Sequence, residues 1–129
     1  MSDRQLIPST SHWARIAGYS RAVRIGTALT ISGTTANDEQ GQTVSVGDAY
    51  GQAVYILQKI QRVLAEAGAR FEDVTRTRIY VTRYDDWEPA ARAHGEVFKD
   101  IRPANTLVVV SSLVPADALV EIEIDAVIA

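Results

Sequence analysis

The sequence predicts an α+β fold in which one mixed β-sheet carries two helices on the same face. Two amphipathic helical patterns alternate with β-rich segments, in the order strands, helix, strand, helix, strands. Each helix follows one strand and precedes another, and right-handed crossovers place both helices on one side of a sheet. The chain has 129 residues without a linker, repeat or low-complexity tract, so we expect a single domain over residues 1–129.

The first half of the chain contains two short strands, a loop and a long helix. Side-chain polarity alternates and β-branched residues recur in segments 21–25 and 27–32, which flank Gly26. This pattern predicts two strands joined by a tight turn. Residues 34–47 are polar and contain glycine, as is typical of a loop. The helix begins after Asp48, a suitable N-cap, and ends before Gly68, a suitable residue to follow the C-cap. Its apolar stripe consists of Ala53, Ile56, Leu57, Ile60, Val63, Leu64 and Ala67.

The second half supplies a strand, a second helix and two further strands. Residues 74–82 alternate as a half-buried strand does, and residues 106–110 and 119–128 form the last two strands around a turn at 115–117. The helix begins near Asp85, and Pro89 fits its first turn because N–H groups there lack helical partners. One face of the first of these strands should carry Thr75, Thr77, Ile79 and Val81, and the other face Arg76, Arg78, Tyr80 and Thr82. The inner stripe of the helix should contain Trp87, Ala91, His94 and Phe98.

Composition excludes several classes of function. The net charge of −3 argues against long-range attraction to nucleic acid or anionic lipid. The absence of cysteine excludes disulfides, zinc–thiolate sites and a thiol nucleophile. His12 and His94 are the only histidines, so we expect no metal site. We also expect no cofactor. A lone histidine on an inner helix face, such as His94, is usually a packed residue. Residues 1–10 lack an apolar core of signal-peptide length and no run could span a membrane, which favours a cytoplasmic location.

Three carboxylates alternate along the last strand. Glu121, Glu123 and Asp125 project from one face of it, and for the latter two a solvated strand face is the simpler interpretation. Arg76 and Arg78 are the expected counter-charges if the two strands are neighbours. Because both helices cover one face of the sheet, the other face should be bare and apolar, and a second copy of the chain is its simplest partner.

Several blocks along nearly the whole chain resemble the Rid family, also called the YjgF or UK114 family. Gly-Tyr-Ser-Arg-Ala-Val at 18–23 is similar to the family motif Gly-Pro-Tyr-Ser-Gln-Ala-Val, and Ile-Ser-Gly-Thr at 31–34 is similar to its Val-Ser-Gly-Gln turn. Segments 65–69 and 73–74 match the end of its first long helix, while 102–104 and 119–123 match its C-terminal signature. Matched blocks in the right order are more specific than any one of them.

The resemblance implies a chorismate-mutase-like α+β fold. It also implies a homotrimer whose sheets form a central β-barrel, with three clefts between neighbouring subunits. Deaminase members of the family hydrolyse reactive enamines and imines made by pyridoxal-phosphate enzymes, releasing ammonia and a 2-keto acid. In those members an arginine after Pro-Ala binds the substrate carboxylate, a glutamate of the C-terminal motif positions or activates water, and a tyrosine of the N-terminal motif lines the pocket.

Three residues of this chain match that pattern, namely Tyr19, Ser32 and Glu121, whereas Asn105 stands in place of the arginine. An arginine holds a carboxylate through two charge-assisted hydrogen bonds, which a neutral amide cannot do. Asn105 is therefore either a pocket group suited to a different ligand or an ordinary residue at the start of a strand. A guanidinium could instead come from Arg15, Arg21 or Arg102.

The other candidate pocket residues each have a structural explanation as well. Tyr19 and Trp87 are aromatic residues, which pack cores as often as they line pockets. Trp87 falls where the family usually has an aromatic residue. Ser32 has no histidine–acid partner in its sequence context, so a nucleophilic role is not expected, and Gly33 suits the geometry of a turn.

The sequence thus predicts a hydrolase or deaminase of a small enamine or imine metabolite, with specificity altered by Asn105 and with Glu121 orienting water. A trimer that binds a small metabolite without hydrolysing it is the alternative. The ribonuclease activity attached to the family name is not expected, because the chain has net charge −3 and no visible basic patch or stacking array. The expected partners are further copies of the chain and a small molecule, not nucleic acid or a membrane. The predicted substrate-binding residues are Tyr19, Ser32, Gly33, Trp87 and Asn105.

Overall fold

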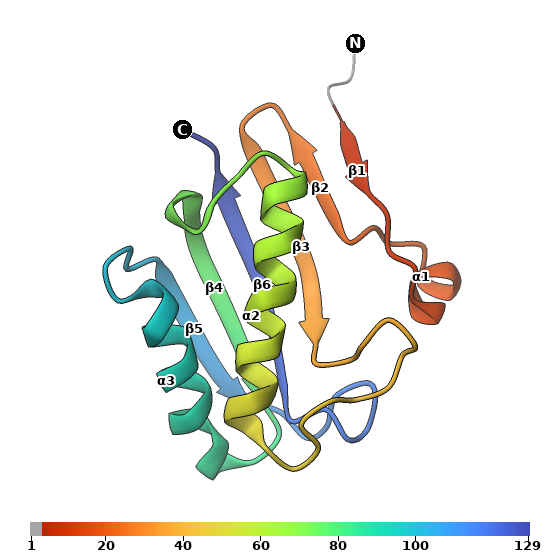
Figure 1. Cartoon of the computed structure of the whole chain (residues 1–129), viewed down its shortest axis with the longest axis vertical. Coiled ribbons are helices and arrows are strands. Elements are labelled where there is room, and N and C mark those ends of the chain that lie inside the picture. The colour runs from red at the N-terminus through yellow and green to blue at the C-terminus, as the bar shows by residue number, and fades with distance from the viewer. Residues whose placement is uncertain (1–3) are drawn as a thin grey trace.

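A six-stranded mixed sheet is the frame of the molecule (Figure 1), which a computed structural model describes over residues 4–129. Residues 1–3 of the N-terminal segment lie outside the described part. The strand order is β1-β2-β3-β6-β4-β5, and every pair of neighbours is antiparallel except β4 and β5. The predicted α+β class is confirmed. The strands are β1 (Gln5–Ile7), β2 (Ala22–Ile25), β3 (Ala28–Thr35), β4 (Val74–Val81), β5 (Ala104–Val109) and β6 (Val120–Val127).

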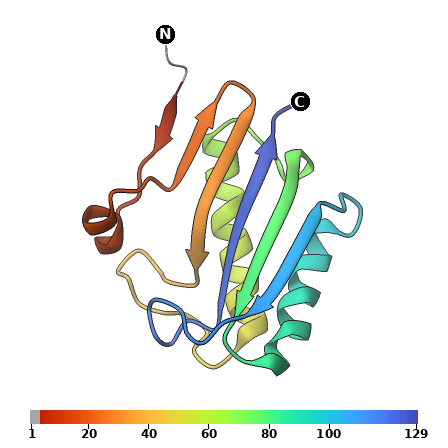
Figure 2. The same cartoon turned by 180° about the vertical axis from the view of Figure 1, so that it is seen from behind.

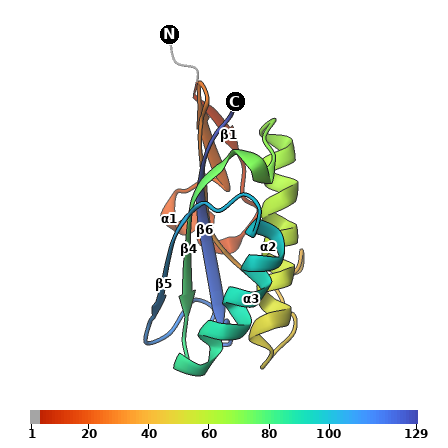
Figure 3. The ribbon, with the colours of Figure 1, turned by 90° about the vertical axis from the view of Figure 1, so that its left-hand side faces the viewer.

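Both long helices, α2 (Ala49–Glu66) and α3 (Trp87–Phe98), cover the same face of the sheet (Figure 3), as predicted. Asp48 caps α2 by accepting a hydrogen bond from Gly51 N at 2.9 Å, and Gly68 adopts φ 81° just past its end. No described helix is long and apolar enough to cross a bilayer. The largest fully buried apolar side chains between helices and sheet are Leu29, Ile31, Ile56, Ile60, Leu64, Ile79, Val81, Phe98, Val120, Ile122 and Ile124.

A short N-terminal helix, α1 (His12–Ala17), escaped the sequence-based prediction, as did β1. Ser11 caps α1, because Ala14 N donates to Ser11 Oγ at 3.1 Å, and the chain leaves the helix through Gly18 at φ 78°. With six residues and one buried side chain, α1 is too short to show an apolar period. It lies at the β1 edge of the sheet (Figures 1 and 2). Two 3₁₀ turns, Phe71–Asp73 and Tyr84–Asp86, precede β4 and α3.

Two burial predictions were wrong in detail. Trp87 was expected on the inner stripe of α3 but is 44% exposed, because the helix turns Ala90, Ala93 and Phe98 toward the core instead. Trp87 is the first residue of α3 and lies at the edge of that packed face. Thr75 was expected to share one face of its strand with Thr77, Ile79 and Val81, but it is exposed, because a register shift after Val74 interrupts the alternation. The other three residues of that face are buried.

The face of the sheet opposite the helices (Figure 2) is charged at its centre, so the expectation of a bare apolar face was wrong there. Arg78 of β4 lies 3.4 Å from Glu123 and 3.3 Å from Asp125 of β6, which confirms Arg78 as their counter-charge. Tyr80 donates its hydroxyl to Glu123 Oε1 at 2.5 Å. These groups form a hydrogen-bonded polar network, and whether a second copy of the chain covers it remains a prediction.

Candidate active site

A cleft of about 380 Å³ contains Glu121, the residue predicted to act on water. It opens between the N-terminal segment, the end of β3 and the loop before β6, three parts of the chain that are far apart in sequence. Glu121 and Gly33 contribute from the sheet, and Tyr19 and Arg21 contribute from the segment before β2. The full lining is Ser11, Trp13, Tyr19, Arg21, Gly33, Thr35, Asn37, Ser112, Leu113, Val114 and Glu121.

Gly33 makes room for the Glu121 carboxylate. The pairing of β3 with β6 shifts between Ile31 and Thr34, so that the strand is irregular at Gly33. A Cβ built on Gly33 would overlap Glu121 Oε2 and would lie 3.0 Å from its carboxyl carbon. The absence of a side chain at Gly33 therefore allows the Glu121 carboxylate to approach the strand closely. The sequence context had indicated a role in turn geometry instead.

Charge and burial compete at the cleft. Burial, followed by the negative charge of Glu123, raises the pKa of Glu121, while the positive charge of Arg21 opposes that rise. Burial also lowers the pKa of Arg21, which Tyr19 and Glu121 counteract. Arg21 donates through Nη2 to Gly33 O at 2.5 Å, whereas its buried Nε has no hydrogen-bond partner in the described part of the chain. A half-buried carboxylate whose pKa is raised, in a cleft that also contains a guanidinium, is suited both to accept and to donate a proton.

Of the two matched motif residues Tyr19 and Ser32, only Tyr19 lines this cleft. Tyr19 lines it, is 38% exposed, and places its hydroxyl 3.3 Å from Ser11 Oγ. Ser32 does not line it, because its Oγ donates to Ser20 O at 2.7 Å. Its backbone N–H donates to Arg21 O at 3.0 Å, so Ser32 holds the segment that carries Tyr19 and Arg21 against β3.

Asn105 lies elsewhere in the chain. It is near the start of β5, and its Nδ2 donates to Thr77 Oγ1 at 2.9 Å. Thr77 is fully buried, and its Oγ1 lies 2.8 Å from His94 Nε2 on α3. Asn105 therefore points to the helix-covered side of the sheet, while Glu121 faces the opposite side. Within one chain these two residues do not share a site, and Trp87 is also absent from the lining of the cleft.

His94 has the packed, hydrogen-bonded character that its sequence position favoured. Its ring lies 4.6 Å from that of Phe98, and burial lowers its pKa, which favours the neutral imidazole. If Asn105 donates to the Thr77 hydroxyl, that hydroxyl is free to donate in turn to an unprotonated His94 Nε2. Among residues 4–129, no group of three or more His, Asp or Glu side chains could hold a metal ion.

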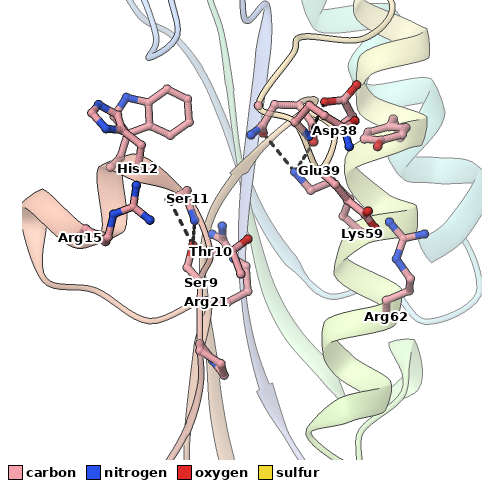
Figure 4. Close-up of a pocket in the computed structure, with 16 residues that line it drawn as sticks. Ser9, Thr10, Ser11, His12, Arg15, Arg21, Asp38, Glu39, Lys59 and Arg62 are labelled. Atoms are coloured by element: carbon pink, nitrogen blue, oxygen red, sulfur yellow. Dashed lines mark hydrogen bonds between the residues drawn. The ribbon is translucent and has the colours of Figure 1, made fainter.

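A second cavity of about 480 Å³ adjoins the cleft (Figure 4). The two share Ser11, Trp13, Arg21 and Asn37. Sequence reasoning missed this cavity, because no sequence signal connects α1, the loop after β3 and the outer face of α2. Its full lining is Pro8, Ser9, Thr10, Ser11, His12, Trp13, Arg15, Arg21, Asn37, Asp38, Glu39, Gln40, Gly41, Tyr55, Lys59 and Arg62.

Known proteins match both the sequence and this architecture. The family described as Endoribonuclease L-PSP matches residues 10–128. The 3-aminoacrylate deaminase RutC of Acinetobacter baylyi is 35% identical over 107 residues, which cover 83% of this chain and 84% of that protein. The crystal structure of Rv2704 from Mycobacterium tuberculosis, a member of the YjgF/YER057c/UK114 family, matches with a TM-score of 0.87 at 38% identity, covering 98% of this chain and all of that one. YyfA of Yersinia pestis, described as a Rid family protein, matches with a TM-score of 0.82 at 31% identity over 95% of this chain and 93% of that one.

A sheet with two long helices on one face is the architecture that this chain shares with these solved structures, and together with the sequence matches it defines the class of protein. The chain belongs to the Endoribonuclease L-PSP family, also called the YjgF/UK114 or Rid family.

Proposed function

We propose that this protein hydrolyses a small imine or enamine metabolite and releases ammonia. The observation that carries the proposal is the Glu121 carboxylate, which is half-buried against Gly33 and has a raised pKa in a cleft of about 380 Å³. The relative named as a 3-aminoacrylate deaminase supports this class of reaction. The substrate differs from a 2-imino acid, because Asn105 stands where the carboxylate-binding arginine is expected.

The proposed reaction uses Glu121 twice. Ionised Glu121 accepts a proton from water as the water oxygen bonds to the carbon of the protonated imine, which gives a neutral carbinolamine. Glu121 then passes this proton to the amine nitrogen and takes the hydroxyl proton of the carbinolamine as the C–N bond breaks, so that ammonia and a carbonyl product leave and Glu121 ends protonated. An enamine first takes a proton at its β-carbon from protonated Glu121 and enters the same path as an imine. A carboxyl group whose pKa is raised by burial serves both as acid and as base.

Of the three alternative arginines, Arg21 is the one that lines the cleft together with Glu121. Arg15 lines only the adjoining cavity, and Arg102 donates to Lys99 O at 3.3 Å at the end of α3. We therefore assign Arg21 the role of stabilising negative charge on the bound substrate. Its unpartnered Nε leaves one donor of the guanidinium without a protein acceptor.

The assembly proposed for this function is a homotrimer. In it, Asn105 and Trp87 of one subunit would complete the cleft that contains Glu121 of a neighbour, since the two sets lie apart within one chain. Asn105 would then offer an amide to a neutral polar group of the substrate. Sedimentation equilibrium measures the assembly, and a monomer at micromolar concentration would contradict it.

The reaction is tested by measuring ammonia release from 2-aminoacrylate and from 3-aminoacrylate, each generated in situ, above the spontaneous rate. We expect slow turnover of the first, and we expect Glu121→Gln to abolish turnover of any accepted substrate while retaining the fold. Turnover of 2-aminoacrylate at the rate of an arginine-containing deaminase would contradict the altered specificity. Saturable binding of a metabolite without ammonia release by the wild type would support the non-catalytic alternative instead.

A further inference from the structure

The larger cavity has an excess of positive charge, although the whole chain has net charge −3. It lies between the N-terminal segment, the loop after β3 and helix α2 (Figure 4). The basic side chains in its lining outnumber the acidic ones by two. The basic residues are Arg15, Arg21, Lys59 and Arg62, and the acidic residues are Asp38 and Glu39.

Two of these charges are used by the protein itself. Asp38 Oδ1 accepts hydrogen bonds from Gln40 N and Gln42 N, both at 2.9 Å, so this carboxylate orders its own loop. Lys59 Nζ donates to Thr35 O and Asn37 O at 2.9 Å and to Asn37 Oδ1 at 3.1 Å. Since an ammonium group has three N–H donors, Lys59 is fully committed to shaping the wall of the cavity.

The guanidinium groups of Arg15 and Arg62 are not committed in this way, and that of Arg21 is committed only through Nη2, which donates to Gly33 O. No hydrogen bond or ion pair among residues 4–129 uses the side chain of Arg15 or Arg62, and the buried Nε of Arg21 has no partner. Arg15 comes from α1 and Arg62 from α2, on opposite sides of the cavity (Figure 4). Burial, and then the positive charges of Arg21 and Arg62, lower the pKa of Lys59 to about 8, and the negative charge of Asp38 opposes this shift only in part.

A row of hydroxyl groups connects this cavity to the cleft. Ser9 Oγ lies 3.2 Å from Ser11 Oγ, and Ser11 Oγ lies 3.3 Å from the hydroxyl of Tyr19. Ser9 lines the cavity, Tyr19 lines the cleft, and Ser11 lines both. An elongated ligand can therefore reach from Glu121 past Tyr19 to the arginines along polar side chains.

We propose that this cavity is a subsite for an oxyanion, a phosphate or a carboxylate, at the far end of the molecule whose imine carbon lies at Glu121. The inference rests on the proposed function and specifies its substrate class: imines and enamines whose anionic group lies several bonds from the reacting carbon. Arginine is the side chain best matched to such oxyanions, because its planar fork donates two parallel hydrogen bonds. A bound oxyanion also relieves the repulsion among the cations around Lys59.

The first experiment measures binding of inorganic phosphate and of acetate to the full chain by titration calorimetry at constant ionic strength. We expect saturable phosphate binding that weakens at least tenfold in Arg15→Gln/Arg62→Gln and is largely retained in Arg15→Lys/Arg62→Lys. Arg62→Gln alone, at an exposed position of α2, should also weaken phosphate binding, and it leaves α1 unaltered. Arg92→Gln is the matched control, because Arg92 pairs with Glu88 at 2.7 Å and lines neither cavity. Equal weakening by Arg92→Gln, or no saturable binding of either anion, would overturn the subsite.

The second experiment compares matched imines with and without a distal phosphate or carboxylate. We expect Arg15→Gln/Arg62→Gln to raise KM about tenfold for the anionic imine, with kcat and the neutral imine unaffected. Ammonia release with the same KM for both imines would overturn the subsite and leave the hydrolase standing. Phosphate binding that depends on Arg15 and Arg62, without hydrolysis of any imine, would support the subsite and contradict the hydrolase. Displacement of phosphate by a short oligoribonucleotide at lower concentration than by any small oxyanion would overturn the small-molecule assignment.

Discussion

The Asn105 amide donates a hydrogen bond to the buried hydroxyl of Thr77, with 2.9 Å between Nδ2 and Oγ1. One of the two N–H groups of the amide is used in this way, and the amide oxygen can act as a hydrogen-bond acceptor. At the position where the family resemblance implies an anion-binding arginine, this chain therefore has a neutral group that can accept a hydrogen bond as well as donate one.

Thr77→Val tests the role of that hydroxyl. Valine fills the same volume but leaves Asn105 Nδ2 and His94 Nε2 without their partner at a fully buried position. We expect a loss of about 1–3 kcal/mol in the free energy of unfolding, as is typical of buried polar groups left unsatisfied. Urea denaturation measures it. Thr75→Val, at an exposed position of the same strand, is the control and should change stability little.

Gly33→Ala should remove activity without unfolding the protein. The added methyl group would meet the end of the flexible Glu121 side chain, so the carboxylate is expected to move rather than the strand. We expect kcat/KM for any accepted imine to fall at least tenfold, since a small misplacement of a catalytic group is costly. Gly95→Ala is the control, because a Cβ there meets nothing within 4 Å. Full activity of Gly33→Ala would show that the present position of Glu121 is not needed.

Glu123→Gln should shift the pH dependence of hydrolysis. The negative charge of Glu123 raises the pKa of Glu121, so its removal lowers that pKa. Because the base form of Glu121 is the ionised one, the acidic limb of the kcat/KM profile should move to lower pH. Glutamine can still accept the hydrogen bond from Tyr80. Asp125→Asn, which removes a carboxylate that does not act on Glu121 in this way, should leave the limb in place.

Glu121→Gln should stabilise the protein at neutral pH. A carboxyl group whose pKa is raised on folding stabilises the fold in its protonated form, and this contribution disappears as the pH rises through the folded-state pKa. At pH 7 the ionised group is therefore unfavourable in the folded state, and a neutral isostere removes that cost. We expect a rise in Tm of a few degrees at pH 7 and a smaller difference near pH 4. An equal or lower Tm at pH 7 would contradict the effect of burial on Glu121.

The fold was largely predictable because its signals are local. Asp48 and Gly68 mark the ends of α2, and the alternation of β6 assigns its carboxylates to one face, as the structure has them. Predictions failed where tertiary contacts decide. The buried face of α3 is set by the small residues Ala90 and Ala93, which are fully buried in the packed core, whereas Trp87 lies at the surface.

The candidate site was predictable only in part. Motif positions identified Glu121, Tyr19 and Gly33, which line one cleft or lie against it. They could not show that the Ser32 hydroxyl donates its hydrogen bond to Ser20 O, or that Asn105 points to the other side of the sheet. These contacts depend on how strands far apart in the sequence pair with one another, and the residue types alone do not predict that pairing.

The segment that contains α1 has a consequence for how substrate preference can change. Residues 8–21 supply Ser11, Trp13, Arg15, Tyr19 and Arg21 to the two cavities, whereas β6 supplies Glu121. Under the proposed function, the residues that would recognise the substrate therefore lie mainly in one contiguous stretch at the edge of the sheet, and the reacting group lies in another. We expect that exchanging residues 8–21 between relatives would change the substrate preference and leave the reaction at Glu121 the same. Substrate specificity could then evolve through changes in one contiguous segment.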